Sequence, residues 1–560
     1  MQPKHSWLFL IPAFVAGALS SFGAAGDAPP RSEPYLQAAR AFADTVLERG
    51  RDTYGPRRTP LFAEGLHAET LEPVRWKRRG DVWVLSNFAS QQALMRLLDG
   101  LSALTGEPRY RAAAEEAARY ALRHLQTPNG LLSWGGHMAW DLEQERPVGQ
   151  YTNIHEMKMH QPHFPLLWRA DAAATRRLLE AIWGAHVLDW ALLDYNRHAR
   201  TDLPSPPQWQ HPFREDVEVP FPTEARNLSF ALSTPSLIAA GTALAVLGND
   251  TNALLWTRRL ARRWQQARDP KTGLSGGQLS YRKEDRARDA LGHVHPTINE
   301  AKIIATYHRT GRYHDIPIAQ MQAAEQLRAA GNKFKSVGDE FIRWASDDLK
   351  TYARHCYDRA SGQFIALMTD GTPIRWQDAR EGYYSPSSFA PAGPDALIFW
   401  NYALAFRLTR DPAHWDMARE IGKVLGLGDL GPKPRSRQRE LDFETRAADW
   451  RFIYGLLELH RATGDRRFLT LAARVGDNLR RWQTQTHLFP RPGYAWGRTG
   501  DAVPLALLHL AAALDGRSDR LPQPMLDNGY LHCEHDGASG PNPNIQDDRT
   551  YDSTIYFGGY

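Results

Sequence analysis

The chain has 560 residues and a formal net charge of +5, from 68 basic and 63 acidic residues. This near balance favours anionic partners only mildly and does not demand nucleic acid. The 2 cysteines, Cys356 and Cys533, exclude a fold held by many disulfides; they pair once or not at all. The 18 Trp and 20 Tyr residues favour carbohydrate binding, because aromatic faces stack on sugar rings as well as anchoring cores.

The N-terminal segment has the pattern of a signal peptide. An apolar stretch at residues 7–18 leads to small residues at 23–25, which predicts that residues 1–25 are removed. Pro12 and Gly17 interrupt the apolar stretch, and no other segment is continuously apolar for about 20 residues, so we expect no membrane anchor after cleavage. The mature protein should be water-soluble and either periplasmic or secreted.

A loose repeat runs through the chain: an apolar helical stretch, a turn with Thr, Gly or Asp, an aromatic residue, and a second Ala-rich helical stretch. Such a repeat predicts stacked helix pairs. The first stretches occupy residues 94–104, 303–308, 402–408 and 453–459, the aromatic residues are Tyr110, Tyr313, Trp415 and Phe468, and a weaker copy turns at residues 248–250.

The first copy shows how such a pair would pack. Five leucines lie on one helical face, while Arg96 and Asp99 should point away from it. Alanines at helical spacing in the partner stretch permit close approach. The leucines are Leu94, Leu97, Leu98, Leu101 and Leu104, and the alanines are Ala114, Ala117, Ala118 and Ala121. We therefore predict a fold dominated by α-helix, an (α/α) toroid or barrel of about six to seven helix pairs with one concave end.

Short β excursions should interrupt the helices. Glycine-containing turns that lead into apolar stretches occur at residues 128–131, 269–274 and 358–364. Glycine suits a left-handed helix cap, and the following residues suit brief strands that would rim the cleft. We expect residues 26–520 to form one catalytic toroid, and residues 521–560, which lack helical periodicity, to form an irregular or β-like tail packed on it.

Histidine and acidic residues are densest between residues 135 and 198. Glu156 and His160 are four apart, so on a helix they would share a face. The pair His155 and His160, five apart, does not fit a zinc-protease helix. The group comprises His137, Asp141, His155, Glu156, His160, His163, Asp194 and the pair Arg197-His198.

This ordered set resembles polysaccharide lyase family 2, the exported pectate lyases of helical-toroid fold. The resemblance implies that His137, Glu156 and His198 bind a divalent transition metal and that Arg197 acts as the base. It implies a lyase that cleaves pectate, polygalacturonate or its oligomers by β-elimination. Around Glu156 there are further histidines that could compete as ligands: His155, His160 and His163.

The chemistry of these residue types agrees with that assignment. Two imidazoles and a carboxylate suit Mn, Co, Ni or Zn far better than Ca, which prefers six to eight oxygen ligands, and among these metals we expect Mn. Three protein ligands leave positions open for substrate. A metal at the uronate C6 carboxylate stabilises the charge that develops when the C5 proton is removed and O4 leaves.

Arginine is an unusual base because guanidinium normally stays protonated, although burial beside a metal disfavours the cation. In the other interpretation Arg197 clamps a uronate carboxylate, and Tyr195 or Lys158 supplies the base. On a helix, Arg197 and His198 would project about 100° apart and meet different partners.

Other segments carry weaker candidates. His293, His295 and Glu300 surround Pro296, which should start a helix, so we favour capping or cleft-lining over metal binding. The run from His532 to His535 in the tail should be structural.

Further substrate contacts are expected around the cleft. The loop of residues 380–386 should lie before an inward helix, where it either contacts substrate or forms a packed aromatic loop. The candidate substrate-binding residues are Lys158, His160, Tyr195, Arg380, Tyr383 and Tyr384.

Two other functions fit the sequence. A toroid glycoside hydrolase would need two carboxylates about 5 to 9.5 Å apart, for which Asp141, Glu156 and Asp194 are candidates. A non-catalytic periplasmic glycan-binding protein would use the same fold without chemistry. In each case we expect an acidic polysaccharide or another glycan as partner, and no nucleic acid.

Overall fold

In the computed structural model the described residues are 30–78, 81–135, 138–149, 151–157, 159–223, 228–306, 314–492 and 494–526. The predicted signal peptide, the His532 to His535 run and Cys533 lie outside them. Cys356 is buried within a helix.

Fifteen α-helices lie in the described part of the chain. Their bounds are α1 (Glu33–Arg49), α2 (Gln92–Thr105), α3 (Pro108–His124), α4 (Phe164–Ala170), α5 (Ala172–His186), α6 (Thr234–Gly248), α7 (Thr251–Gln266), α8 (Arg286–Leu291), α9 (Asp315–Ala329), α10 (Asn332–Cys356), α11 (Ala396–Thr409), α12 (Pro412–Val424), α13 (Trp450–Thr463), α14 (Arg467–Arg480) and α15 (Val503–Leu514).

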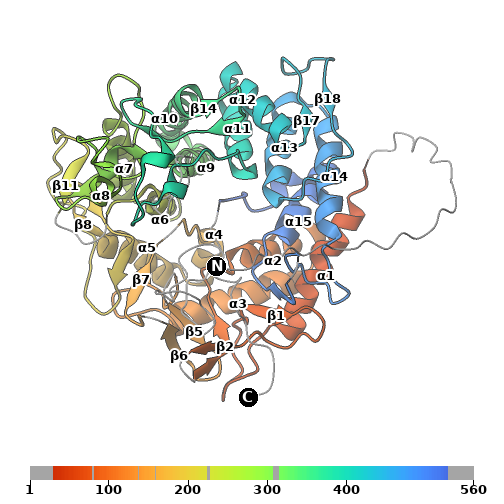
Figure 1. The fold of residues 1–560 in the computed structure, drawn as a ribbon. Coiled ribbons are helices and arrows are strands. Elements are labelled where there is room, and N and C mark those ends of the chain that lie inside the picture. The colour runs from red at the N-terminus through yellow and green to blue at the C-terminus, as the bar shows by residue number, and fades with distance from the viewer. Residues whose placement is uncertain are drawn as a thin grey trace, which may run out of the picture.

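The helices form a closed ring of pairs (Figure 1). The inner helices α2, α15, α13, α11, α9 and α6 each pack against the next, and α5, α4 and α3 close the ring between α6 and α2. The helices α1, α3, α7, α10, α12 and α14 pack on the outside as their partners. This arrangement confirms the predicted (α/α) toroid.

The inner helices are apolar on nearly every side because neighbours enclose them. The segment Ala231–Gly248, which includes α6, is long and apolar enough to cross a membrane by composition, but 83% of it is buried inside the fold. We therefore interpret it as a core helix.

The leucine face of α2 and the alanine face of α3 are buried as predicted. The prediction that Arg96 and Asp99 point away is wrong, because they are only 3% and 5% exposed. The Arg96 guanidinium donates to the backbone oxygen of Gln161 at 2.5 Å, and Asp99 accepts from His163 Nε2 at 2.8 Å. An inner helix of a ring has no solvent face, so its polar residues need partners inside the protein.

The repeated turns share one backbone conformation. Gly106, Asn249, Arg410 and Gly464 all adopt left-handed conformations, with φ of +82°, +53°, +62° and +72°. In three of the turns an aspartate follows and accepts a backbone N–H of the next helix: Asp250, Asp411 and Asp465. The copy at residues 248–250 therefore forms a complete helix pair.

One predicted helix is wrong. Ile303–Ile304 forms strand β13, which pairs with β16 (Leu367–Met368). Helix α9 begins only at Asp315, and residues 307–313, with Tyr313, lie outside the described residues. The short apolar run suits a buried strand as well as a helix, so periodicity alone could not distinguish them.

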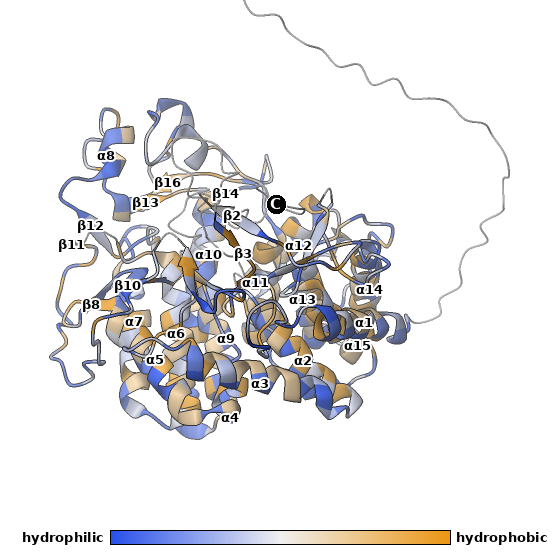
Figure 2. Ribbon diagram, turned by 90° about the horizontal axis from the view of Figure 1, so that it is seen from below, coloured by the Kyte–Doolittle hydropathy of each residue, from blue (hydrophilic) through white to orange (hydrophobic). Residues whose placement is uncertain are grey.

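The strands are short and gather at one end of the ring, where the inner helices begin (Figure 2). They form two- or three-stranded sheets, and in the part of the chain that the structure describes only β11–β12 is parallel. The remaining bounds are β1 (Gly65–His67), β2 (Trp76–Arg78), β3 (Asp81–Trp83), β4 (Leu85–Ser86), β5 (Met138–Asp141), β6 (Arg146–Gly149), β7 (Ile154–Glu156), β8 (Val187–Asp189), β9 (Asp194–Tyr195), β10 (His198–Arg200), β11 (Phe221–Thr223), β12 (Ser280–Arg282), β14 (Tyr357–Asp358), β15 (Gln363–Phe364), β17 (Gly428–Asp429), β18 (Glu440–Leu441) and β19 (Trp496–Arg498).

The three segments predicted as β excursions form different structures. At residues 358–364 the strands β14 and β15 form the expected hairpin, with Gly362 at φ +69°. Around Gly130 there is only a single bridge between Gln126 and Leu132. Residues 269–274 form a hydrogen-bonded turn, in which Asp269 N donates to the Leu274 oxygen at 2.8 Å.

The described start of the tail packs on α9. Gln322 Nε2 donates to the Pro524 oxygen at 3.2 Å, Leu526 N donates to Gln322 Oε1 at 3.1 Å, and the Leu526 side chain is buried. Gln322 is the central residue of α9, and the tail residues 521–524 line one cavity together with side chains of α9, α11, α13 and α15. The tail beyond residue 526 lies outside the described residues.

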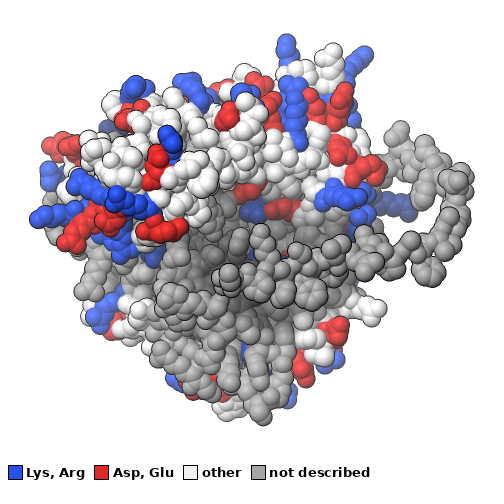
Figure 3. Space-filling view, viewed as in Figure 1, with Lys and Arg blue, Asp and Glu red and all other residues white. Residues whose placement is uncertain are grey.

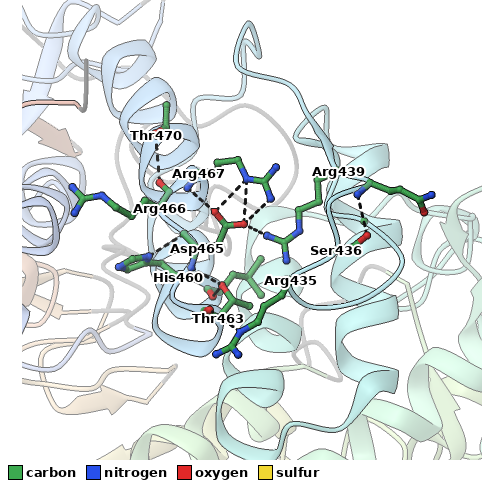
Figure 4. A network of polar contacts seen from close by, with 12 residues as sticks. Arg435, Ser436, Arg439, His460, Thr463, Asp465, Arg466, Arg467 and Thr470 are labelled. Atoms are coloured by element: carbon green, nitrogen blue, oxygen red, sulfur yellow. Dashed lines mark hydrogen bonds and ion pairs between the residues drawn. The ribbon is translucent and has the colours of Figure 1, made fainter. Parts of the chain in front are cut away.

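A polar network ties α12, α13 and α14 together (Figure 4). Arg439 and Arg467 both pair with Asp465. The Arg439 guanidinium is completely buried and lies over the rings of Trp415 and Phe468, at 5.4 and 5.1 Å from their centroids. The network therefore stabilises contacts between neighbouring pairs of the ring.

Candidate active site

Two short strands bring the predicted site residues together. β7 and β10 are antiparallel, with His198 opposite Glu156 and Ala199 opposite His155. Met157 N also donates to the Arg197 oxygen at 2.7 Å. The pairing holds Glu156 beside the Arg197-His198 pair, although the sequence separates them by about 40 residues.

Glu156 Oε1 is the centre of the group. It lies 3.3 Å from His198 Nε2 and 3.3 Å from Arg197 Nε. The Glu156 side chain is fully buried, while those of Arg197 and His198 are 12% and 20% exposed. The guanidinium carbon of Arg197 lies 5.3 Å from the centroid of the Phe230 ring. A buried carboxylate, an imidazole and a cation therefore meet at a partly open position.

These residues are not on helices, contrary to both helical expectations. Glu156 ends β7, so the expected helical face shared with His160 does not form. Arg197 directly precedes β10 and His198 begins it, so their expected separation of about 100° does not apply either. The short strands have too few residues to show a period in the sequence.

Gly135 flanks β7 on the side away from β10. It forms a parallel bridge with Glu156 and has φ +114°. A Cβ atom at residue 135 would lie 2.8 Å from the backbone oxygen of Glu156. Only glycine fits this close approach. The predicted ligand His137 follows two residues later and, like Lys158, lies outside the described residues.

His155 is engaged on both ring nitrogens. Trp134 Nε1 donates to His155 Nε2 at 2.8 Å, and His155 Nδ1 lies 2.8 Å from His186 Nε2. His186 Nδ1 lies 2.7 Å from the Asn196 oxygen. Since the indole N–H must donate, His155 donates from Nδ1 to His186, and His186 donates to Asn196. His155 therefore positions β7 and has no nitrogen left for a metal.

Both rings of this relay are buried and neutral. Burial lowers the pKa of His155 well below its usual value, and the nearby His186 and His160 rings lower it further. Burial also lowers the pKa of His186 to about 4. Neutral rings suit a relay in which each imidazole donates once and accepts once.

The other competing histidines differ. His163 donates to Asp99 of α2, which also pairs with Arg111 and Arg169. The role of His163 is therefore to bind a buried carboxylate of that helix. His160 is buried and lies near His155, without a position on a helix face shared with Glu156.

The donor set fits a metal at two of its predicted positions. Donors at about 2.0 to 2.1 Å from a tetrahedral ion lie about 3.3 Å apart, which is the distance from Glu156 Oε1 to His198 Nε2. Among the described residues no three His, Cys, Asp or Glu side chains converge on one point. The third predicted ligand is His137, which is not among them.

Two carboxylates proposed for a hydrolase are engaged inside the protein. Asp141 accepts the backbone N–H groups of Val84 and Glu143, both at 3.2 Å, and burial raises its pKa to about 6. Asp194 accepts the hydroxyls of Thr223 and Ser229, both at 2.6 Å. Both aspartates fix turns and strands rather than facing Glu156 across an open space.

Tyr195 is a core residue, which contradicts its predicted contact with substrate. It is completely buried, and its hydroxyl lies 2.6 Å from Thr234 Oγ1 and 3.1 Å from the Phe230 oxygen. Burial raises the pKa of its phenol, so it is also a poor base.

The loop of residues 380–386 is packed at one aromatic residue and more open at two others. Tyr384 is buried and stacks on Phe389 at 5.9 Å, which contradicts a sugar-stacking role and matches a packed aromatic loop. Arg380 is exposed and Tyr383 is half-buried under the guanidinium of Arg286, at 4.4 Å.

The rival histidine cluster does not form a metal site in this structure. Glu300 is fully buried and paired by Arg282, and Asn299 accepts Ala301 N at 3.1 Å to cap a 3-10 helix, Glu300–Lys302. The helix begins there rather than at Pro296, and His293 is exposed. The cap is therefore Asn299, which is not one of the three residues of the predicted cluster.

The charges around the ring are mixed. Basic and acidic side chains alternate over the described part of the face in Figure 3, in keeping with the small net charge. Attraction of an anionic polymer must therefore come from local cations such as Arg197.

Sequence reasoning missed several residues of the site. Trp134 and His186 complete the relay behind Glu156, and Phe230 supports Arg197. Their aromatic character was a signal, but their partners lie 21 to 33 residues away in sequence and meet only in the folded ring.

Comparison with known proteins shows the family of the chain. The sequence matches the family described as periplasmic pectate lyase over residues 59–534. The chain belongs to this family. It is therefore a polysaccharide lyase, the family implies an acidic polysaccharide as substrate, and the expected location outside the cytoplasm is confirmed as periplasmic.

The lyase also resembles individual proteins. It is 26% identical over 544 residues to the pectate disaccharide-lyase of Dickeya dadantii (strain 3937), covering 90% of this chain and 93% of that relative. Among solved structures it is similar to the cellobiose 2-epimerase of Bacillus thermoamylovorans B4167, at 9% identity and a TM-score of 0.40, over 71% of this chain and 90% of that one. An α-1,6-mannanase of Salegentibacter sp. HEL1_6 shows 10% identity and a TM-score of 0.36, over 86% and 99%.

Proposed function

We propose that this lyase cleaves a polyuronate such as pectate, polygalacturonate or its oligomers by metal-assisted β-elimination. The observation that carries the proposal is the position of Glu156 Oε1, 3.3 Å from both His198 Nε2 and Arg197 Nε. A pair of metal donors and a nitrogen base thus meet at one point, as elimination next to a carboxylate requires.

Glu156 and His198, with His137, would hold a divalent transition metal, with Mn before Co, Ni or Zn. When bound there, such a cation neutralises the substrate C6 carboxylate and so makes the C5 proton more acidic. The His155–His186 relay keeps β7 in register, which positions the Glu156 carboxylate.

Arg197 is the proposed base. Its backbone is fixed by Met157 and its guanidinium by the Phe230 ring. These two contacts hold the guanidinium beside the Glu156 carboxylate, where the metal would be bound.

The electron balance of the step is simple. Arg197 takes the C5 proton onto a guanidine nitrogen, and the C5–H electron pair forms the C4–C5 double bond. The C4–O4 bond breaks with its electron pair on O4, which then receives a proton from solvent. The product therefore carries a 4,5-unsaturated uronate at its new non-reducing end.

The alternative hydrolase is not favoured, because Asp141 and Asp194 are engaged in internal hydrogen bonds. Without them Glu156 has no second carboxylate among the proposed candidates to complete an acid and base pair. Membership of a lyase family also argues against a non-catalytic glycan-binding protein.

The test is to give the purified protein polygalacturonate and follow the ultraviolet absorbance of the unsaturated product. We expect absorbance to rise with Mn, to stop after chelation, and to recover with Mn or Co better than with Ca. Reducing ends without absorbance would show hydrolysis instead, and full activity with Ca alone would contradict the ligand assignment.

A further inference from the structure

A buried amide near Phe230 has no hydrogen-bond partner among the residues that the structure describes. Gln278 is 1% exposed, and neither its Nε2 nor its Oε1 has a hydrogen-bond partner within the part of the chain that the structure describes. A buried carboxamide without partners costs free energy, so its presence needs an explanation.

The position of Gln278 is fixed by a pair of strand-like segments. Gln278 lies opposite Phe230 in an antiparallel bridge, flanked by hydrogen bonds from Ala231 N to the Gly277 oxygen at 2.9 Å and from Leu279 N to the Ser229 oxygen at 3.0 Å. Side chains directly opposite each other in such a pair lie on the same face. Since the Phe230 ring carries the Arg197 guanidinium, the Gln278 amide lies on the Arg197 side.

Its neighbours along the segment are satisfied within the protein. Ser280 Oγ accepts Ser229 N at 3.2 Å, and Arg282 pairs with Glu300. Gln278 differs from both because its amide has no partner in the described ranges of the chain. Glu156 of the candidate site is buried to the same degree as Gln278.

We propose that Gln278 binds the substrate, through hydrogen bonds between its carboxamide and a ring hydroxyl of the uronate that loses its C5 proton to Arg197. The inference rests on the proposed function of the Arg197 site. An amide both donates and accepts, as a hydroxyl does, and it is uncharged, so it does not repel the uronate carboxylates. Gln278 is therefore a specificity residue for the hydroxylated sugar ring.

The decisive variant is Gln278→Met, which keeps the length of the side chain and removes the amide. Because the amide has no internal partner, we expect the melting temperature to stay the same or to rise. We expect KM for trigalacturonate to rise and kcat/KM to fall about tenfold, as for the loss of one well-placed hydrogen bond.

A matched control is Gln322→Met in the middle of α9. Gln322 is equally buried but is bonded to Pro524 and Leu526. We expect this variant to lose melting temperature and to keep the kcat/KM of the wild type. A third variant, Gln278→Glu, keeps the shape, and its carboxylate should raise KM further by repelling the polyanion.

Two readouts separate this inference from the proposed function. If the wild type makes unsaturated product but Gln278→Met keeps its KM and kcat/KM, the inference is overturned and the lyase assignment stands. If the wild type makes no unsaturated product, the lyase assignment fails. Calorimetric binding of trigalacturonate to the wild type and to Gln278→Met then tests the role of Gln278 alone. We expect the variant to lose affinity by about tenfold, and an unchanged affinity would overturn the inference. A lower melting temperature with unchanged activity in Gln278→Met would show a purely structural amide.

Discussion

Within the site, the internal partners of each imidazole decide its role. His155 and His186 use their ring nitrogens on Trp134, on each other and on Asn196, whereas His198 Nε2 faces Glu156 Oε1. An imidazole with both nitrogens occupied holds a strand in place, and one that faces a buried carboxylate can bind a metal. Neighbouring histidines therefore have different functions.

The neutral relay predicts a pH dependence of stability. The folded pKa of His186 is about 4, against 6.5 when unfolded, and that of His155 is also lowered by burial. Below pH 6.5 the unfolded chain binds protons that the folded one cannot, so the free energy of unfolding should fall as pH drops from about 6.5 to about 4.

Denaturant unfolding at half-unit pH steps would measure this fall. The variant His186→Gln removes one of the titrating rings and should give a shallower slope over the same range. An equal slope in the variant and the wild type would mean that His186 does not stay neutral in the folded protein.

At this scale the sequence could predict that Glu156, Arg197 and His198 lie together, because the resemblance rests on their order and on the adjacency of Arg197 and His198. It could not reveal that His155 is occupied, since His186 lies 31 residues away and meets it only through β8, β9 and the turn to β10. Nor could it show that Tyr195 is buried, because a tyrosine serves cores and binding sites equally well.

Among the elements, the repeated turns contribute most directly to the fold. Gly464 and Gly106 adopt φ of +72° and +82° with no atom within 4 Å of a would-be Cβ. Replacing either glycine by a residue with a Cβ would therefore cost free energy through the backbone conformation and not through a steric clash. A left-handed conformation costs a residue with a Cβ about 1 to 2 kcal/mol.

We expect Gly464→Ala to destabilise the protein by about 1 kcal/mol and to leave kcat unchanged, because the turn is remote from Glu156. Gly393→Ala is the control: this glycine also has open space around it and no left-handed φ, so its substitution should be near neutral. Chemical denaturation of both variants would test this. Equal stability of the two would contradict the role of the left-handed turn.

Sequence periodicity predicts the long helices better than the short strands. Helices of 14 residues, such as α2 and α13, display their apolar period clearly. The strands β7, β10 and β13 have two or three residues, so they show none. The pairing of β7 with β10 instead depends on contacts with Gly135 and Met157. The site lies on the elements whose sequences are least informative.

For the whole molecule, closing the ring brings the two ends of the described chain together. α15 packs on both α1 and α2, and β1 pairs with β19. The helical repeat predicted pairs and a ring, because each pair leaves an apolar face uncovered until its neighbour arrives. The strands at one end were only partly predictable, since they depend on the length of each connection.

The ring also explains where the candidate site lies. The inner helices begin at the end where the strands gather, and α6 begins beside Met157, whose oxygen accepts the Ser233 hydroxyl at 3.0 Å. The buried helix ends give a rigid support for Glu156, Arg197 and Gln278. A rigid support of this kind holds reacting groups in place without movement of the core.

The central claim is that Arg197 removes the proton and His198 holds the metal. The most direct measurement is kcat on polygalacturonate together with metal content for Arg197→Ala and His198→Ala. We predict that Arg197→Ala keeps its metal and loses turnover by at least about a thousandfold, and that His198→Ala loses its metal. Substantial kcat in Arg197→Ala, or unchanged metal content in His198→Ala, would contradict the account.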